Sequence, residues 1–270
     1  MDRIDIYTTR TLDSGVRPIE VRFSPIYDCY YGRMIGFRGK TCINSILYGS
    51  LEPSRYLSAL DAEGDETGLS LAKYGIRRTL RDLCRENDLA GIEFVTLQVS
   101  SSVLFCEGLY DALKQAAEGR DIALLRRIYL EFGEEVLTLG EEQVARAFSD
   151  IRAAGFRVAI RGYGNRFFPM GELVHLTPDA VFLDRETVAL LDSRERSAVV
   201  PSFIRFAASL DVRVIAEGVP DDGHLRELNS AECAAFLPDP GYHGALLCST
   251  EEKELVPWLT ERRESVRGGE

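Results

Sequence analysis

The chain has 270 residues, of which 45% are hydrophobic and 28% are charged, and its formal net charge is −11. This composition excludes disorder along the whole chain. The negative charge argues against a nucleic-acid polymer as partner, because phosphate binding needs clustered cations. No run approaches about 18 consecutive apolar residues, so we expect no membrane association. The first residues lack the apolar core of a signal peptide, and the expected location is the cytoplasm.

Six scattered cysteines form neither a C-x-x-C pair nor a cluster with histidine, so neither a zinc site nor a disulfide framework is indicated. We expect them to be buried or half-buried free thiols. They are Cys29, Cys42, Cys84, Cys106, Cys233 and Cys248.

Residues 1–17 are polar and predict a tail or a lead-in strand. Apolar runs then predict a strand over 19–26 and a second over 33–37. A short helix is expected over 52–62. A longer one is expected over 67–89, where apolar residues recur at helical spacing.

From residue 92 onward, strands and helices alternate regularly. Strands are predicted at 92–99, 128–132, 156–160, 180–183, 212–216 and near 234–236. Four helices are predicted in this part of the chain. The first begins at about residue 107, the second ends near 155, the third begins at about 192, and the fourth covers about 250–262. The spacing Asp192-x-x-Glu195 resembles a capping box at the third of these helices. The alternation implies parallel β-α units and predicts an α/β fold, a single (β/α)8-type TIM-like barrel over residues 18–265. An open doubly wound sheet is the alternative, but no glycine-rich phosphate loop follows the first strand.

Polar side chains stand where the predicted barrel strands end. They are Arg38, Gln98, Glu131, Arg161, Asp184 and Glu217, with His243 after the last strand. Ligands of such barrels bind at the carboxyl ends of the strands, where these residues would meet. The set therefore predicts either a polar ligand-binding pocket or a group of ion pairs that closes the end of the barrel.

Several motifs, in order, resemble the EAL-domain cyclic-di-GMP phosphodiesterases over residues 18–262. The matching segments are 22–28 (RFSPIYD), 97–101 (LQVSS), 129–134 (YLEFGE), 158–164 (VAIRGYG), 181–185 (VFLDR) and 215–219 (IAEGV). The resemblance implies a barrel whose first strand runs antiparallel to the others.

The departures from the family pattern concern the catalytic positions. Members of this family hydrolyse a phosphodiester with two divalent metals held by carboxylates and an asparagine. The resemblance places the Glu of the E-A-L motif at Arg38, the Asn at Gln98, the paired Asp residues at Arg161 and Gly162, and the catalytic Lys at Phe182. Glu131, Asp184 and Glu217 keep the family residue, as does Glu134. Hard cations need several oxygen ligands, so we expect no metal, no cofactor and no catalytic residue. We expect instead that Arg38 or Arg161 pairs with one of the remaining acids.

The resulting prediction is a degenerate, catalytically inactive EAL-like domain that acts in signalling through a protein partner. The loop 162–170 carries Tyr163, Phe167, Phe168 and Met170, which are residue types typical of interfaces. The resemblance also implies a homodimer through residues 162–175.

Two alternatives stay open. The first is a receptor that binds cyclic di-GMP without hydrolysing it, which is less favoured because Lys40 and Cys42 replace the ligand-holding Leu and Arg of the E-A-L segment. The second is an enzyme with altered chemistry on the same barrel, whose candidate residues are Glu131, Asp184, Glu217 and His243.

Overall fold

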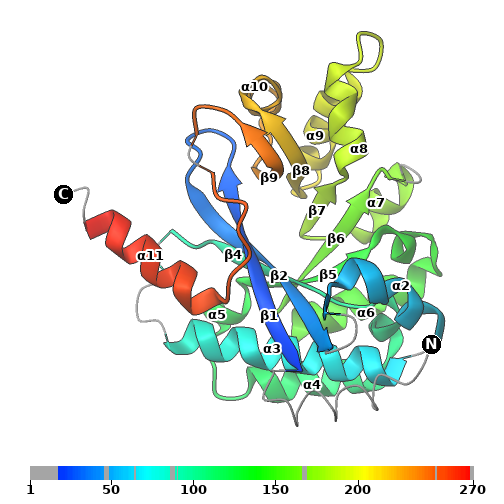
Figure 1. Ribbon diagram of the computed structural model, residues 1–270. Helices are drawn as coiled ribbons and strands as arrows, with labels where there is room; N and C mark the ends of the chain where they lie inside the picture. Colours follow the sequence, from blue (N-terminus) through cyan, green and yellow to red (C-terminus); the bar gives the residue numbers. More distant parts are fainter. Residues whose placement is uncertain are drawn as a thin grey trace.

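Eight strands close into a barrel in the computed structural model, which describes residues 18–45, 49–63, 65–85, 89, 91–165, 169–246 and 248–267 (Figure 1). The barrel strands are β1 (Ile19–Asp28), β2 (Met34–Ser45), β4 (Phe94–Gln98), β5 (Ile128–Gly133), β6 (Arg157–Tyr163), β7 (Ala180–Leu183), β8 (Arg213–Asp221) and β9 (Ala235–His243). A short outer strand, β3 (Gly49–Leu51), pairs with β2. The predicted tail, residues 1–17, lies outside the described residues.

The barrel is mixed, because β1 runs antiparallel to both of its neighbours. It pairs with β2 from Ile19 to Tyr27 and with β9 through Tyr27 and Asp28. The pairs from β2 through β4 and on to β9 are parallel. The expected barrel and its antiparallel first strand are therefore both confirmed, and the open-sheet alternative is wrong.

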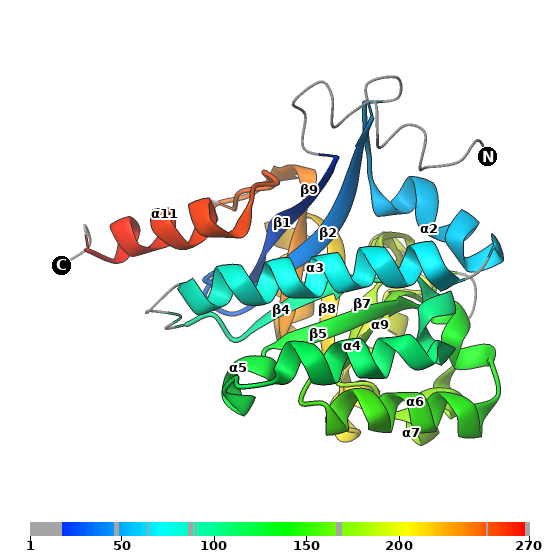
Figure 2. The same ribbon diagram turned by 90° about the horizontal axis from the view of Figure 1, so that it is seen from below.

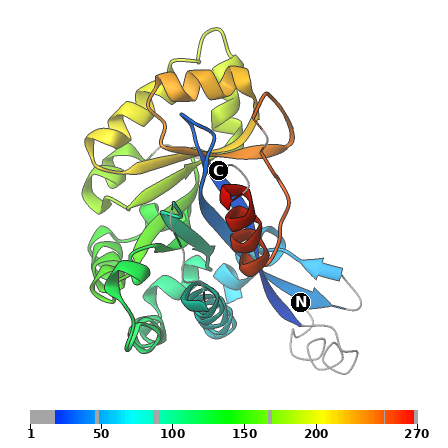
Figure 3. The ribbon, with the colours of Figure 1, turned by 90° about the vertical axis from the view of Figure 1, so that its left-hand side faces the viewer.

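Helices cover the outside of the barrel. The α-helices are α2 (Pro53–Glu63), α3 (Asp65–Arg85), α4 (Glu107–Ala117), α5 (Ile122–Leu125), α6 (Glu141–Ala153), α7 (Met170–Leu176), α8 (Arg185–Val188), α9 (Val199–Ser209), α10 (Asp222–Ser230) and α11 (Leu255–Arg267). Short 3-10 helices are η1 (Ser101–Phe105), η2 (Glu134–Thr138) and η3 (Ala189–Asp192). Helices α3, α4 and α6 lie side by side along one flank (Figure 2), while α11 lies beside β1 (Figure 3). None of the described helices is both long and apolar enough to cross a bilayer.

Three apolar clusters of described residues hold these elements together, of which the third joins α2 to β2 and α3 and the other two form the layers of the barrel. The larger one fills the space between the strands and the helices. The smaller one fills the barrel interior with Phe94, Phe182, Ile26, Ile215, Leu237 and three alanines. Large phenylalanine and small alanine side chains together fill the interior of a small barrel. The interior is therefore a packed core, and the polar residues at the barrel mouth lie above it.

One predicted helix start is wrong. The pattern at Asp192 predicted a helix from that residue, but Asp192 ends η3 and α9 begins at Val199. The Asp192 carboxylate lies 3.2 Å from His224 Nε2 instead of capping a helix. A short polar motif near a turn can thus serve a tertiary contact rather than a cap.

Candidate functional site

The alternation of side chains along the strands brings the polar residues together at the barrel mouth. In β4, Phe94 lies in the interior core, while Thr96 and Gln98, two and four positions later, both reach Glu131 of β5. Successive inward positions of a barrel strand form layers along its axis. The apolar layer is therefore followed, towards the carboxyl ends, by a polar one.

Glu131 is the centre of this polar layer and is fully buried. Its Oε1 accepts hydrogen bonds from Arg38 Nη2 at 2.5 Å and Gln98 Nε2 at 3.1 Å. Its Oε2 accepts from Thr96 Oγ1 at 2.9 Å, and Arg38 Nε lies 3.1 and 3.2 Å from the two oxygens. Both oxygens of this carboxylate are thus occupied by protein donors, as a buried charge requires.

Arg38 of β2 links two acids across the mouth. Besides its side-on contact with Glu131, its Nη1 lies 2.9 Å from Glu217 Oε2 of β8. The guanidinium stands over the Phe182 ring, 4.5 Å from the ring centroid, in a cation–π contact. The expected pairing of an arginine with the remaining acids is confirmed for Arg38, which bonds two of them.

The electrostatics of the pair are asymmetric. Burial by itself lowers the pKa of Arg38, but the Glu131 and Glu217 carboxylates outweigh it and raise that pKa above its ordinary value. Burial raises the pKa of Glu217, and Arg38 only partly opposes this rise. Arg38 is therefore a permanent cation here. Glu217 protonates more readily than a glutamate in free solution.

Arg161 of β6 behaves differently from Arg38. Its Nη1 donates to the backbone carbonyls of Val99 at 3.0 Å and Glu131 at 2.7 Å, rather than to a carboxylate. Of the two arginines expected to pair with an acid, Arg38 alone does so among the described residues. The parallel register places Arg161 beside Gly133, where carbonyls at the end of β5 are the nearer acceptors.

Two further candidates stand apart from this cluster. Asp184 caps α8 by accepting from the Glu186 amide at 2.9 Å, and Asn165 Nδ2 lies 3.3 Å from its other oxygen. His243 is exposed, and its Nδ1 lies 3.2 Å from the carbonyl oxygen of Gly241. Neither residue makes a hydrogen bond to Arg38, Glu131 or Glu217 in the described part of the chain.

Two cavities have Arg38 and Glu217 among their lining residues. One, of about 560 Å³, is lined by Gln98, Glu134, Arg161, Asn165 and both members of the pair. The other, of about 190 Å³, is lined by Lys40, Arg185, Glu252 and again both members of the pair. Among the residues that the structure describes, no three His, Cys, Asp or Glu side chains converge to hold a metal ion.

The loop after β6 contains the interface candidates. Glu134 Oε2 accepts from the Gly164 amide at 3.1 Å and so supports this loop. Tyr163 is fully buried and stacks on Phe203, with 4.8 Å between ring centroids, so its ring cannot serve as an exposed interface residue. Met170 is 41% exposed and stays a candidate. Phe167 and Phe168 lie outside the described residues.

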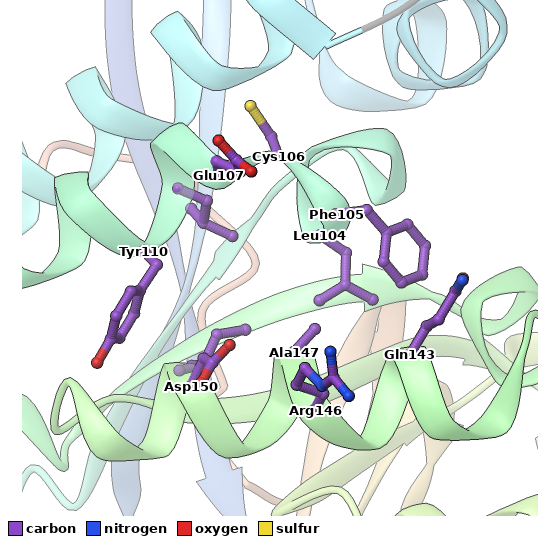
Figure 4. Close-up of a pocket in the computed structure, with 11 residues that line it drawn as sticks. Leu104, Phe105, Cys106, Glu107, Tyr110, Gln143, Arg146, Ala147 and Asp150 are labelled. Carbon is purple, nitrogen blue, oxygen red and sulfur yellow. The ribbon is translucent and has the colours of Figure 1, made fainter.

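Another cavity, of about 410 Å³, lies outside the barrel between η1, α4 and α6 (Figure 4). Phe105, Tyr110 and Arg146 are among its lining residues, and none of the candidate site residues predicted at the strand ends belongs to it. It is therefore separate from the strand-end cluster.

Three contributors to the site were missed by sequence reasoning. Thr96 lies inside an apolar strand run, and its even spacing from Gln98 was the available signal. Phe182 was considered only as the replacement of a lysine, and not as the ring beneath Arg38. Lys40 forms an ion pair with Glu252, Nζ to Oε1 at 2.5 Å, across more than 200 residues of sequence, a contact that no local pattern can predict.

A family model described as "EAL domain" matches residues 13–237. The chain belongs to the EAL-domain family. It is 26% identical over 218 residues to the cyclic di-GMP phosphodiesterase NbdA of Pseudomonas aeruginosa, covering 80% of this chain and 27% of NbdA. It is 29% identical over 114 residues to the blue light- and temperature-regulated antirepressor BluF of Escherichia coli, covering 42% of this chain and 28% of BluF.

A solved structure of the EAL enzyme Bd1971, in its cAMP- and cyclic-di-GMP-bound form, superposes with a TM-score of 0.76. The sequence identity is 18%, and the match covers 96% of this chain and 69% of that one. This likeness shows the shared fold. The chain spans less than a third of the length of NbdA and of BluF, so it corresponds to one part of each of those proteins.

Proposed function

We propose that this EAL domain does not hydrolyse cyclic di-GMP and acts in signalling by binding a protein partner. The observation that supports the first half is the position of Arg38. Its guanidinium lies between Glu131 and Glu217, in the layer where this family's metals would need carboxylate oxygens. These residues do not fit a pair of divalent cations.

Electrostatic repulsion also opposes metal binding in this layer. A divalent ion entering this layer would meet the fixed positive charge of Arg38 and a Glu131 whose two oxygens already accept hydrogen bonds. At separations of about 4 Å, like charges repel by several kcal/mol at the effective dielectric constant of a protein interior. Since Arg38 stays protonated at any physiological pH, raising the pH would not release the acids for a metal.

The test of hydrolysis is an assay with cyclic di-GMP and saturating Mg²⁺ or Mn²⁺, followed by chromatographic detection of the linear dinucleotide. An active family member serves as positive control. We expect no product. Product formation that disappears in Glu217→Gln would overturn this half of the proposal, whereas product that persists in Glu217→Gln identifies a contaminating enzyme.

Two observations support the binding of a protein partner. BluF, one relative of this chain, is named an antirepressor, a regulatory function, whereas NbdA is named a phosphodiesterase. The exposed Met170 at the start of α7 adds an apolar contact point. The test is quantitative affinity purification from the native cell, comparing the parent chain with Met170→Asp and with Val199→Asp as a control. Val199, at the start of α9, is 40% exposed and so matches Met170 in exposure. We expect a stoichiometric partner that is lost only with Met170→Asp.

A second candidate function is a receptor for cyclic di-GMP. The observation that favours it is Arg161, whose Nη1 makes both of its hydrogen bonds while its Nε and Nη2 have no protein acceptor among the described residues. Arg161 lines the 560 Å³ cavity and could bind a phosphate there. Calorimetric titration with cyclic di-GMP, with and without Mg²⁺, discriminates the two functions. Saturable binding that Arg161→Met abolishes would favour the receptor.

A further inference from the structure

A groove between α3 and α4, remote from the barrel mouth, concentrates positive charge on this acidic chain. Its volume is about 500 Å³, and it is lined by Arg77, Leu80, Arg81, Cys84, Arg85, Gln115, Ala116 and Arg120. Among the residues that the structure describes, half of the lining is arginine and none of it is a carboxylate. The two helices lie side by side on the outer flank of the barrel (Figure 2).

The helix geometry places three of the arginines in one row. Arg77, Arg81 and Arg85 recur every four residues along α3, so their side chains share a face. Like charges at this spacing destabilise a helix by a few tenths of a kcal/mol per pair. The partial negative charge at the end of α3 offsets some of this repulsion but leaves the guanidinium N–H groups available.

Two arginines are held in place from opposite sides of the groove. Arg77 Nη2 donates to Gln115 Oε1 at 3.0 Å. Arg120 Nε donates to the carbonyl of Ala116 at 2.8 Å, and its Nη1 lies 2.8 Å from Cys84 Sγ. These contacts orient both guanidinium groups while engaging only part of their donors.

Several other described arginines are paired with acids, among them Arg38, Arg152 and Arg185. Arg78, on the other side of α3, bonds Asp82 at 2.8 Å and Glu254 at 3.2 Å. Within the described residues, neither Arg81 nor Arg85 has a carboxylate partner. The arginines that face the groove therefore differ from Arg78 both in their position on α3 and in having no acid partner among the described residues.

We propose that this groove binds a small molecule bearing a diphosphate or triphosphate group. Guanidinium groups match phosphate oxygens with paired hydrogen bonds, and four of them call for more than one phosphate. The volume lies within the range of small-ligand sites, and Leu80 and Ala116 give it an apolar floor. A nucleic-acid polymer would extend beyond the groove and meet a chain of net charge −11.

Cys84 provides a reporter inside the groove, because it is an exposed free thiol. The experiment measures alkylation of each cysteine by iodoacetamide with mass spectrometry, with and without inorganic pyrophosphate, at constant ionic strength. We expect pyrophosphate to slow alkylation of Cys84 and leave Cys106, in the separate cavity between α4 and α6, unchanged. A parallel calorimetric titration gives the affinity, and ATP and adenosine then test whether a nucleotide is accepted through its phosphates.

The variants decide whether the arginines are responsible. Arg81→Gln combined with Arg85→Gln should weaken pyrophosphate binding at least about tenfold, the scale of losing one charged hydrogen bond. Arg194→Gln combined with Arg205→Gln makes the same change in net charge at exposed sites elsewhere and should leave binding intact. The proposal is overturned by absence of pyrophosphate binding, by equal protection of Cys84 in the Arg81/Arg85 variant, or by stronger protection from a hexaglutamate peptide, which would indicate an acidic protein segment instead. None of these outcomes depends on hydrolysis or ligand binding at the barrel mouth.

Discussion

Replacing Arg38 by Met tests the central feature of the barrel mouth. The substitution removes the cation but retains a long apolar side chain that can rest on Phe182. Glu131 is fully buried and would keep only Thr96 and Gln98 as side-chain donors. Removing one partner of a buried ion pair costs about 3–5 kcal/mol, because it leaves an uncompensated charge. That is a large part of the 5–15 kcal/mol that stabilises a typical domain.

The assay is urea unfolding followed by circular dichroism at pH 7.5. The free energy of unfolding of Arg38→Met should lie about 3–5 kcal/mol below that of the parent, because Glu131 is left buried without its cation.

A double variant, Arg38→Met with Glu131→Gln, serves as the control. It removes the buried charge together with its partner, and we expect it to be more stable at pH 7.5 than Arg38→Met alone. A cost below about 1 kcal/mol for Arg38→Met would refute the reasoning. It would mean that Glu131 does not depend on Arg38, and the acids would then be free to bind a cation.

Four further outcomes are expected. Glu217→Gln should cost less free energy of unfolding than Glu131→Gln, because the Glu217 side chain is 21% exposed and that of Glu131 is fully buried; urea titrations of both variants check this. Arg161→Met should cost about 1–3 kcal/mol in the same assay, the scale of charged hydrogen bonds to carbonyls, and a cost above this range would indicate an ion pair instead. Burial raises the pKa of Cys42 and of Cys248 to about 11. The stability that their neutral thiols contribute is therefore present below about pH 9 and is lost as the pH rises towards 11. Over this range the melting temperature of the parent should fall more steeply than that of the Cys42→Ala/Cys248→Ala variant. Light scattering at tens of micromolar should give a dimer that Met170→Asp converts to a monomer, and a monomeric parent would contradict the predicted homodimer.

The sequence carried enough information for the barrel and for the strand-end residues, because both depend on local periodicity. Strands of period two alternating with helices fix which residues lie at the carboxyl ends, and this placed Arg38 and Glu131 at one mouth. This periodicity does not indicate which of the two arginines bonds the acids. That choice depends on the register between strands, which sets Arg161 beside Gly133 and beyond the carboxylate of Glu131.

The position of Tyr163 also depends on strand pairing and could not be predicted from the sequence. Its neighbours suggested a loop with exposed aromatic residues, but β6 continues to Tyr163 through a register shift after Ile160. Gly162 adopts a φ of 68° there, a conformation that glycine takes without strain. The irregularity turns the tyrosine ring into the helical layer against Phe203. A bulge of this kind depends on the pairing partner, so no count of alternating residues could predict it.

The Arg38–Glu217 ion pair also limits what the barrel mouth can hold. Arg38 and Glu217 line both mouth cavities. A ligand that drew the Arg38 guanidinium away from Glu217 would also disturb its hydrogen bonds to Glu131, because the same guanidinium bonds both acids. A ligand in the larger cavity that bound Arg161 would leave these bonds in place. A receptor function is therefore compatible with the Arg38 ion pairs, whereas a phosphodiesterase would need its metals in the layer that Arg38 occupies.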